Sequence, residues 1–93
     1  MIYKVFSIYD VAVKSYMQPF FMKSIGEAER ALKGLVNDEK HNFSKYAQDF
    51  TLFDLGSFDE TNGRFTMHSS PVSIAVLIEY KDLVSEKLVS VSS

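Results

Sequence analysis

The stretch FTLFDLGSFDETNGRFTMH, from Phe50 to His68, decides the fold of this chain. Its first part, Phe50 to Phe58, is rich in aromatic and aliphatic residues and predicts a β-strand. Asn62-Gly63 supplies the left-handed backbone conformations that a tight hairpin turn requires. Arg64 to His68 is then expected to form the returning strand, so this stretch predicts a β-hairpin.

A second pair of strands is expected at the N-terminus. Ile2 to Tyr9 is dense in β-branched and aromatic residues, and both of its alternating faces carry apolar groups, which suits a central strand. Asp10 to Lys14 predicts a turn, and Tyr16 to Met22 predicts the second strand. Because Pro19 has no amide hydrogen to donate, this second strand is expected at a sheet edge or at a bulge.

A helix is predicted between the two strand pairs, from Ser24 to Val36. Ser24-Ile25-Gly26-Glu27 has the spacing of a capping box, in which the serine and the glutamate each accept a backbone hydrogen bond. The apolar residues that follow recur at helical intervals and form one stripe: Ile25, Ala28, Leu32, Leu35 and Val36. We therefore expect this helix to pack on one face of the sheet.

The remaining segments give weaker signals. His41 to Asp49 is polar and predicts a loop that contains a short helical turn. Pro71 to Ile78 has the composition of a strand, although the apolar spacing from Val76 onward also fits a helix. We interpret this part as an extended lead-in followed by a helix from about Leu77 to Leu88, and residues 89–93 as a frayed tail.

These elements together predict the α+β class. We expect a small antiparallel sheet of two hairpins in the order β-β-α-β-β, with one capped helix on a face and a C-terminal helix. The 93 residues fit a single domain, residues 1–93, since domains usually contain about 50 to 250 residues and no Gly/Ser/Pro-rich linker divides this chain.

The composition argues against an enzyme. The chain has no cysteine, which excludes disulfides, thiolate metal sites and a cysteine nucleophile. His41 and His68 lie in polar surroundings without metal-ligand spacing, and Asp54, Asp59 and Glu60 adjoin a turn where acidic residues are common. No glycine-rich phosphate loop is present. We therefore expect no catalytic residues, no metal site and no cofactor.

Neither secretion nor membrane insertion is expected. The N-terminus lacks a charged segment followed by a long apolar run. The longest apolar run, from Ile74 to Ile78, is far shorter than the ~20 residues that span a bilayer.

Aromatic residues placed beside lysines are the most informative functional pattern. Aromatic residues make up 14% of the chain, and several adjoin a cation, as in Tyr3-Lys4, Lys14-Ser15-Tyr16, Phe20-Phe21-Met22-Lys23 and Lys45-Tyr46. Single-stranded nucleic acids bind such surfaces because bases stack on rings while cations contact phosphates. The net charge of −2 gives no overall attraction to nucleic acid. A protein-binding surface, including one for self-association, fits the same pattern equally well.

Several segments together resemble a known family, the small nonstructural protein of gokushovirus-type single-stranded DNA microviruses. In that family the middle of the chain resembles F-x-K-x-P-E-D-F-x-L-Y-x-L-G-x-F-D. Here Ala47-Gln48 replaces Pro-Glu, and Phe53 replaces Tyr. The resemblance extends over about residues 2–64 and is carried by these segments: Tyr3 to Asp10 with Ala12, Tyr16 to Phe20, Glu27-Ala28 with Arg30, Val36 to Asp38, Phe43 to Asp59, and Thr61 to Gly63.

The resemblance implies a phage protein that acts in the host cytoplasm and is absent from the mature virion. It also implies binding of single-stranded DNA and a role in the switch from duplex replication to synthesis or packaging of single-stranded genomes. The alternative is a protein–protein adaptor or scaffold of the phage replication or assembly complex that makes no direct contact with DNA. A homodimer or higher oligomer and other phage replication proteins are the expected protein partners.

For DNA binding, we expect the N-terminal strand pair to form the platform, with Tyr3, Tyr16 and Phe21 as stacking rings. Phe6, Phe20, Phe50 and Phe58 are assigned to the core instead. Either face of the first strand could be the outward one, because both are apolar. The residues expected to contact nucleic acid are these: Tyr3, Lys4, Lys14, Tyr16, Phe21, Lys23, Lys45, Tyr46 and Arg64.

Overall fold

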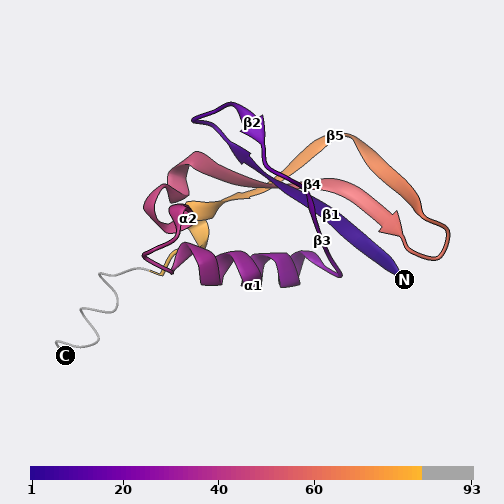
Figure 1. The fold of residues 1–93 in the computed structure, drawn as a ribbon, viewed down its shortest axis with the longest axis horizontal. Helices are drawn as coiled ribbons and strands as arrows, with labels where there is room; N and C mark the ends of the chain where they lie inside the picture. Colours follow the sequence, from indigo (N-terminus) through magenta and orange to yellow (C-terminus); the bar gives the residue numbers. More distant parts are fainter. Residues whose placement is uncertain (83–93) are drawn as a thin grey trace.

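The computed structural model describes residues 1–82 and shows a curled antiparallel sheet with helical segments gathered at one end (Figure 1). The elements, in chain order, are β1 (Ile2–Asp10), β2 (Ser15–Tyr16), β3 (Phe20–Met22), α1 (Ile25–Val36), α2 (Asn42–Lys45), the 3-10 helix η1 (Ala47–Asp49), β4 (Phe50–Asp59), β5 (Arg64–Val76) and the 3-10 helix η2 (Leu77–Tyr80).

The sheet has the order β2-β1-β4-β5, and β3 also pairs with β1. All pairings are antiparallel. In this order β1 and β4 are the central strands. The helix α1 lies along one face of this sheet (Figure 1). The expected α+β class, the antiparallel sheet and the helix on one face are therefore confirmed.

The second predicted strand, Tyr16 to Met22, is divided into two short strands. The chain departs from β1 at Met17-Gln18-Pro19, between β2 and β3. Here the Ser7 hydroxyl donates a 2.6 Å hydrogen bond to the Met17 carbonyl, and the Met17 amide donates to the Ile8 carbonyl at 2.7 Å. The edge position expected from Pro19 is confirmed, and the proline accounts for the interruption because it cannot donate to the ladder.

The helix α1 begins after Ser24, as the sequence predicts. The Ser24 hydroxyl accepts a hydrogen bond from the Glu27 amide at 3.2 Å. The Glu27 carboxylate accepts from the amide of Lys23 instead of Ser24, at 3.1 Å, so the capping box is shifted by one residue. Of the predicted apolar stripe, Ala28, Leu32 and Val36 are buried. Ile25 and Leu35 are each 37% exposed and lie at its margin.

The core lies between α1 and the face of the sheet that it covers. Phe6 and Ile8 of β1 and Phe50 and Leu52 of β4 pack with the buried side of α1 and with Leu77. Phe6 and Phe50 are buried as expected, and Phe20 packs at the edge of the cluster. The assignment of Phe58 to the core is wrong, because its side chain is only half-buried and lies outside this cluster.

The C-terminal part of the described chain differs from its prediction. The strand β5 continues from Arg64 to Val76, so the expected short returning strand and the extended lead-in form one element. The segment from Leu77 is a single 3-10 turn, and Lys81 is already extended, with φ −79° and ψ 134°. A continuous helix starting at Leu77 is therefore wrong. Its remaining part, residues 83–88, and the tail at residues 89–93 lie outside the described residues.

The turn η2 is fastened to α1 by polar contacts. The Tyr80 hydroxyl donates a 2.6 Å hydrogen bond to the Glu29 carboxylate. The Asn37 side-chain amide donates to the Tyr80 carbonyl at 3.0 Å and accepts from the Asp82 amide at 2.8 Å. Partial burial and the hydrogen bond to Glu29 raise the pKa of the Tyr80 phenol well above its ordinary value.

We expect Tyr80→Phe to lower the free energy of unfolding by about 1 kcal/mol at neutral pH, because it removes a hydrogen bond to a carboxylate. The folded-state pKa is raised, so this stabilisation is present below the unfolded pKa of about 10 and is lost as pH rises through the folded pKa. Urea titrations of both proteins at neutral pH and above pH 10 will check this. If the difference in free energy of unfolding between the two proteins increased with alkaline pH, the stabilising role of the Tyr80–Glu29 hydrogen bond would be contradicted.

Candidate functional site

The face of the sheet opposite α1 carries most of the exposed aromatic rings. Cross-strand partners in an antiparallel sheet share a face. The pairs Tyr9↔Tyr16, Val5↔Phe21, Tyr3↔Phe58 and Phe58↔Phe65 therefore define one surface. We call this surface the open face, and its large side chains are Tyr3, Tyr9, Tyr16, Phe21, Phe53, Phe58, Phe65 and Met67.

The rings of the open face form two clusters. In the first triad, the ring of Tyr16 lies 4.9 Å from that of Tyr9 and 5.3 Å from that of Phe53, between ring centroids. In the second triad, the Phe58 ring lies 5.7 Å from Phe21 and 4.8 Å from Phe65.

Each triad presents ring surface to solvent. Tyr16, Phe21 and Phe65 are 43%, 45% and 54% exposed. Among the described residues, no helix covers these rings, because α1 and its neighbours pack on the other face.

A β-bulge brings the two triads onto the same face. Phe53 and Phe58 are separated by an odd number of positions, so a regular strand would direct them to opposite faces. In β4, however, Asp54 pairs with Phe6 while Gly56 pairs with Val5, which leaves Leu55 as an extra residue. This extra residue restores the parity, and it explains why Phe58 lies on the open face and not in the core.

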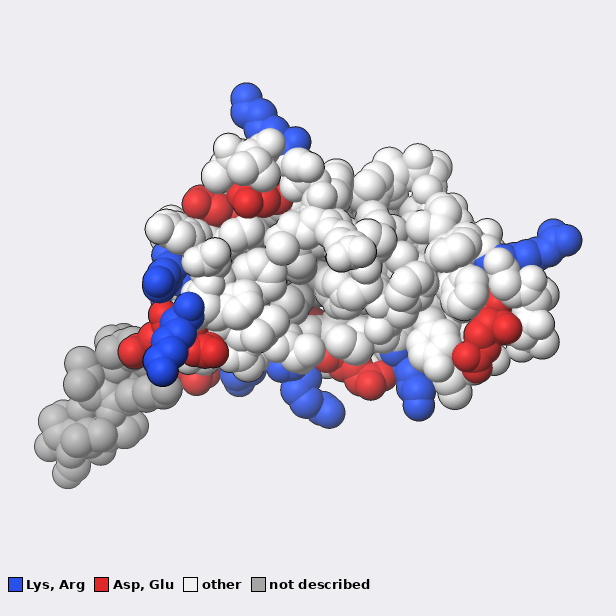
Figure 2. Space-filling view, viewed as in Figure 1, with Lys and Arg blue, Asp and Glu red and all other residues white. Residues whose placement is uncertain are grey.

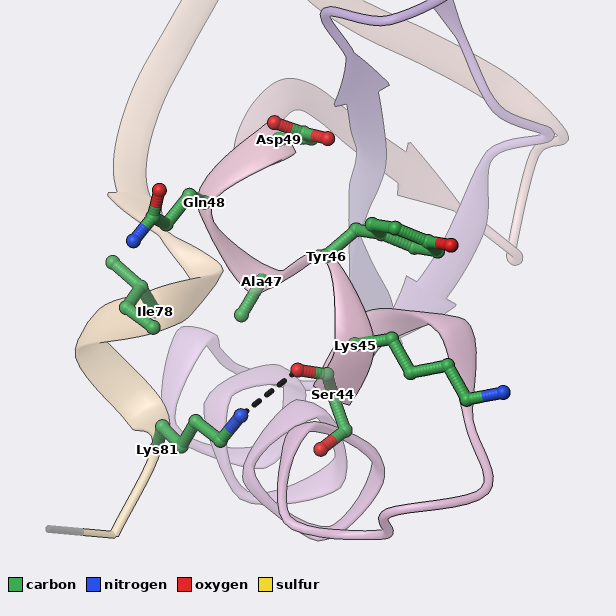
Figure 3. Close-up of a pocket in the computed structure, with 8 residues that line it drawn as sticks. All are labelled: Ser44, Lys45, Tyr46, Ala47, Gln48, Asp49, Ile78 and Lys81. Atoms are coloured by element: carbon green, nitrogen blue, oxygen red, sulfur yellow. Dashed lines mark hydrogen bonds between the residues drawn. The ribbon is translucent and has the colours of Figure 1, made fainter.

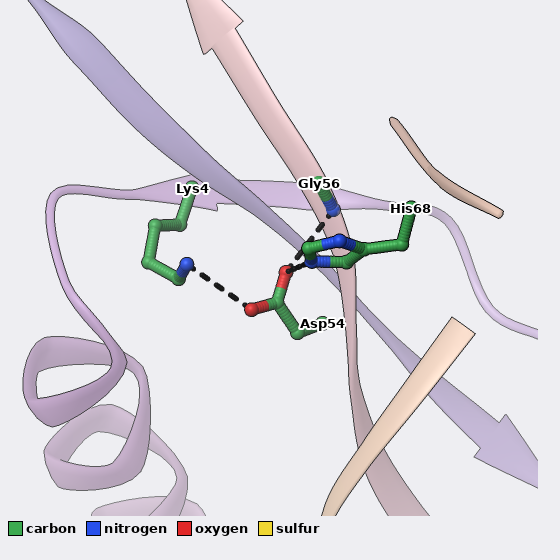
Figure 4. A network of polar contacts seen from close by, with 4 residues as sticks. All are labelled: Lys4, Asp54, Gly56 and His68. Atoms are coloured by element: carbon green, nitrogen blue, oxygen red, sulfur yellow. Dashed lines mark hydrogen bonds and ion pairs between the residues drawn. The ribbon is translucent and has the colours of Figure 1, made fainter. Parts of the chain in front are cut away.

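The buried carboxylate of Asp54 holds this bulge (Figure 4). Its Oδ1 atom accepts from the Gly56 amide and contacts Nε2 of His68, both at 3.1 Å. Its Oδ2 atom lies 3.1 Å from the Lys4 ammonium group. Lys4, expected to contact nucleic acid, is thus on the face opposite the rings and is paired with a carboxylate.

Of three other expected cations, two lie at the rim of the open face. These two are Lys14, in the turn between β1 and β2 with φ 56°, and Lys23, between β3 and α1. The third, Arg64 of β5, is the cross-strand partner of Asp59 and is directed to the face opposite Phe65. All three are exposed and, within residues 1–82, form no ion pair. Figure 2 shows a broad surface without charged side chains over the strands, with Lys, Arg, Asp and Glu around its margins.

Lys45 and Tyr46 lie apart from the open face. They line a polar cavity of about 300 Å³ at the corner of α2, η1 and η2 (Figure 3). There the Lys81 ammonium donates to the Ser44 carbonyl at 2.9 Å, and the Lys45 side chain extends away from Lys81. Tyr46 also lines a second cavity with Phe50, a residue of the covered face. The structure therefore separates these two residues from Tyr3, Tyr16 and Phe21.

The open face includes rings that sequence reasoning missed: Tyr9, Phe53, Phe58 and Phe65. For Phe58 and Phe65, the signal that could have found them is Gly56, because a glycine inside a strand pattern often marks a bulge. Tyr9 could have been found because it shares the alternating face of Tyr3 on the first strand. The exposed Phe65, next to Arg64, also repeats the pairing of ring and cation seen elsewhere in the chain.

Two other kinds of site were sought in the part of the chain that the structure describes. No group of His, Cys, Asp or Glu side chains in residues 1–82 could hold a metal ion. None of the described helices is long and apolar enough to cross a bilayer.

Comparison with known proteins gives one family match. A family model described as Phage ORF5 protein matches residues 3–80 of the chain. The matched region contains every ring of the open face and the bulge at Gly56. No curated protein and no solved structure matches the chain significantly.

Proposed function

Because this chain belongs to the Phage ORF5 protein family and is a phage protein, we propose that it binds single-stranded DNA on the open face. The observation that supports this proposal most directly is the pair of exposed aromatic triads on one uncovered face of the sheet. In this proposal the protein is nonstructural and non-enzymatic. It acts in the host cytoplasm during the switch from duplex replication to synthesis or packaging of single-stranded genomes.

Ring stacking and charge would act together in such binding. Each base stacked on a ring contributes about 1–3 kcal/mol, so a few exposed rings suffice for measurable affinity. The net charge of −2 opposes DNA binding at long range. Lys14 and Lys23 offset this locally, because no carboxylate within the described chain pairs with them and each is free to contact a phosphate.

Salt dependence provides the first test. With two phosphate contacts, the logarithm of the association constant should fall against the logarithm of salt concentration with a slope of about −1.4, since each contact to a single strand contributes about −0.7. Fluorescence anisotropy with a labelled oligothymidylate measures this slope. Lys23→Ala should reduce its magnitude by about 0.7. Affinity that does not change with salt would rule out the phosphate contacts.

The matched control is Lys33→Ala. Lys33 lies on α1, away from the open face, and is 3.9 Å from the Asp82 carboxylate. We expect its removal to leave the salt slope close to that of the unmodified protein. A duplex of the same sequence serves as the second control. Its bases are stacked on one another and cannot reach the rings, so we expect clearly weaker binding to it.

A protein–protein adaptor is the second candidate function. The observation in its favour is that the strand positions of the open face carry no charged side chain within residues 1–82. In addition, β5 is an edge strand that pairs only with β4, and most of it is exposed. Such surfaces also suit a second copy of the chain or another phage replication protein. Light scattering that shows concentration-dependent assembly, together with no preference for single strands at low salt, would favour this alternative.

A further inference from the structure

We infer that the open face is a bipartite site, in which the two aromatic triads form separate base-stacking subsites for one DNA strand. The bulge in β4 keeps both subsites on the same face. This inference rests on the proposed function, and it adds the length of strand that the site needs and the residue that positions its two halves.

The spacing of the triads sets the length of the ligand. Along β1, the first triad lies beside Ser7 and Tyr9 and the second beside Tyr3 and Val5, so their midpoints are four positions apart. At about 3.3 Å per residue, the triads are separated by about 13 Å. Stacked nucleotides repeat at about 3.4 Å along one strand, so this separation corresponds to about four nucleotides.

Residues without aromatic rings separate the two subsites. Val5 and Ser7 of β1, and Gly56 of β4, lie on the open face between the triads and are buried. None of them offers an exposed ring, so a base above this region has no stacking partner there. A strand shorter than about four nucleotides therefore engages one triad at a time, whereas a longer strand reaches both.

The bulge positions the second triad relative to the first. Without the extra residue at Leu55, Phe58 and its partner Phe65 on β5 would turn away from the face that carries Phe53. Asp54 holds the bulge through the Gly56 amide, His68 and Lys4. Asp54 is itself buried beneath the open face, so it is a positioning residue and does not contact the ligand.

Binding of oligothymidylates from about two to about twelve nucleotides tests the bipartite site, since single-strand sites on small domains accept about four to sixteen. We expect weak binding below about four nucleotides. Above that length, affinity should rise by roughly 10- to 100-fold, because engagement of the second triad becomes intramolecular.

Two variants separate the halves. Tyr16→Ser removes an exposed ring of the first triad, and Phe65→Ser removes one of the second. Each variant should abolish the rise in affinity with oligonucleotide length. The affinity for the shortest oligonucleotides should fall by no more than about twofold, because the other triad still binds them. Tyr46→Ser is the matched control. Tyr46 is 56% exposed but lies off the open face, so this change should leave the whole length profile unaltered.

A third pair of variants tests the positioning role. Asp54→Ala removes the acceptor that holds the bulge and should flatten the length profile while short oligonucleotides still bind. Asp54→Asn keeps an oxygen for the Gly56 amide and should restore part of the rise. Circular dichroism checks that each variant is folded. If Asp54→Ala does not fold, the Asn variant and the two serine variants still decide the question.

The outcomes distinguish this inference from the proposed function. If no oligonucleotide binds at any length, the proposed function fails. If the protein binds DNA, but Phe65→Ser weakens short and long oligonucleotides by the same factor, the site is continuous and the bipartite inference is overturned while DNA binding stands. A smooth rise with length in every variant would overturn it in the same way.

Discussion

Replacing Gly56 with alanine is expected to destabilise the protein by about 3 kcal/mol or more. A Cβ atom at this position would lie 2.4 Å from the Thr66 carbonyl oxygen and 2.7 Å from the Met67 Cα atom. Both atoms belong to the backbone of β5, so no side-chain rotation can relieve the contact. The φ angle of +149° is also one that residues with a side chain rarely adopt. Strain and overpacking each cost about 1–3 kcal/mol.

Gly34→Ala is the matched control, because it makes the same chemical change in open space. Nothing lies within 4 Å of a Cβ atom at Gly34, which is inside α1. Alanine favours a helix over glycine by about 1 kcal/mol, so this variant should be slightly more stable than the original protein. Urea unfolding measures both changes from the midpoint and slope. If Gly56→Ala unfolded at the original midpoint, the close approach of β4 and β5 at the bulge would be wrong.

Replacing Phe6 with alanine is expected to cost about 3–5 kcal/mol, as for other fully buried phenylalanines. Phe6 has no exposed surface, lies in the core beside α1, and stacks on Phe20 with ring centroids 5.6 Å apart. Removal of its ring leaves a cavity in the core between α1 and the sheet. A small domain has little stability to spare, so we expect this variant to unfold at a much lower temperature.

Phe65→Ala makes the same substitution on the other face and is the natural comparison. Phe65 is 54% exposed, so its removal should cost less than about 1 kcal/mol in free energy of unfolding. Phe65→Ala should also weaken binding to long oligonucleotides, because it removes a ring of the open face. Phe6→Ala leaves those rings in place, so its effect on binding can be measured only where the variant remains folded. Thermal and urea unfolding of the two variants therefore tests which face of the sheet is covered. Equal losses of stability would contradict the face assignment.

Local signals predicted most of the described secondary structure. The capping sequence at Ser24 and the apolar stripe behind it predicted α1, since both depend on residues within one or two helical turns. Asn62-Gly63 predicted the hairpin because the turn conformation depends on those residues themselves. Pro19 likewise predicted an edge or a bulge, and the structure places this residue at the sheet edge, between the short strands β2 and β3.

The candidate site was predictable only in part. Tyr16 and Phe21 were expected as exposed rings, and the structure places both on the open face. Tyr3 and Lys4 were expected to act together, but adjacent residues of a strand point to opposite faces, and Lys4 pairs with Asp54. The positions of Lys45 and Tyr46, away from the open face, depend on the packing of α2 and η1, which no local pattern specifies.

The sequence by itself determined that this chain forms an antiparallel sheet with a capped helix, and that its rings often adjoin cations. Only the tertiary structure decided which rings are exposed. Both faces of β1 are apolar, so the choice depended on where α1 packs. Phe53 and Phe58 share a face only because Leu55 is an extra residue in β4. The carboxylate of Asp54, which contacts Lys4 and His68, holds this bulge. Those contacts join residues far apart in the chain, and short-range periodicity cannot encode them.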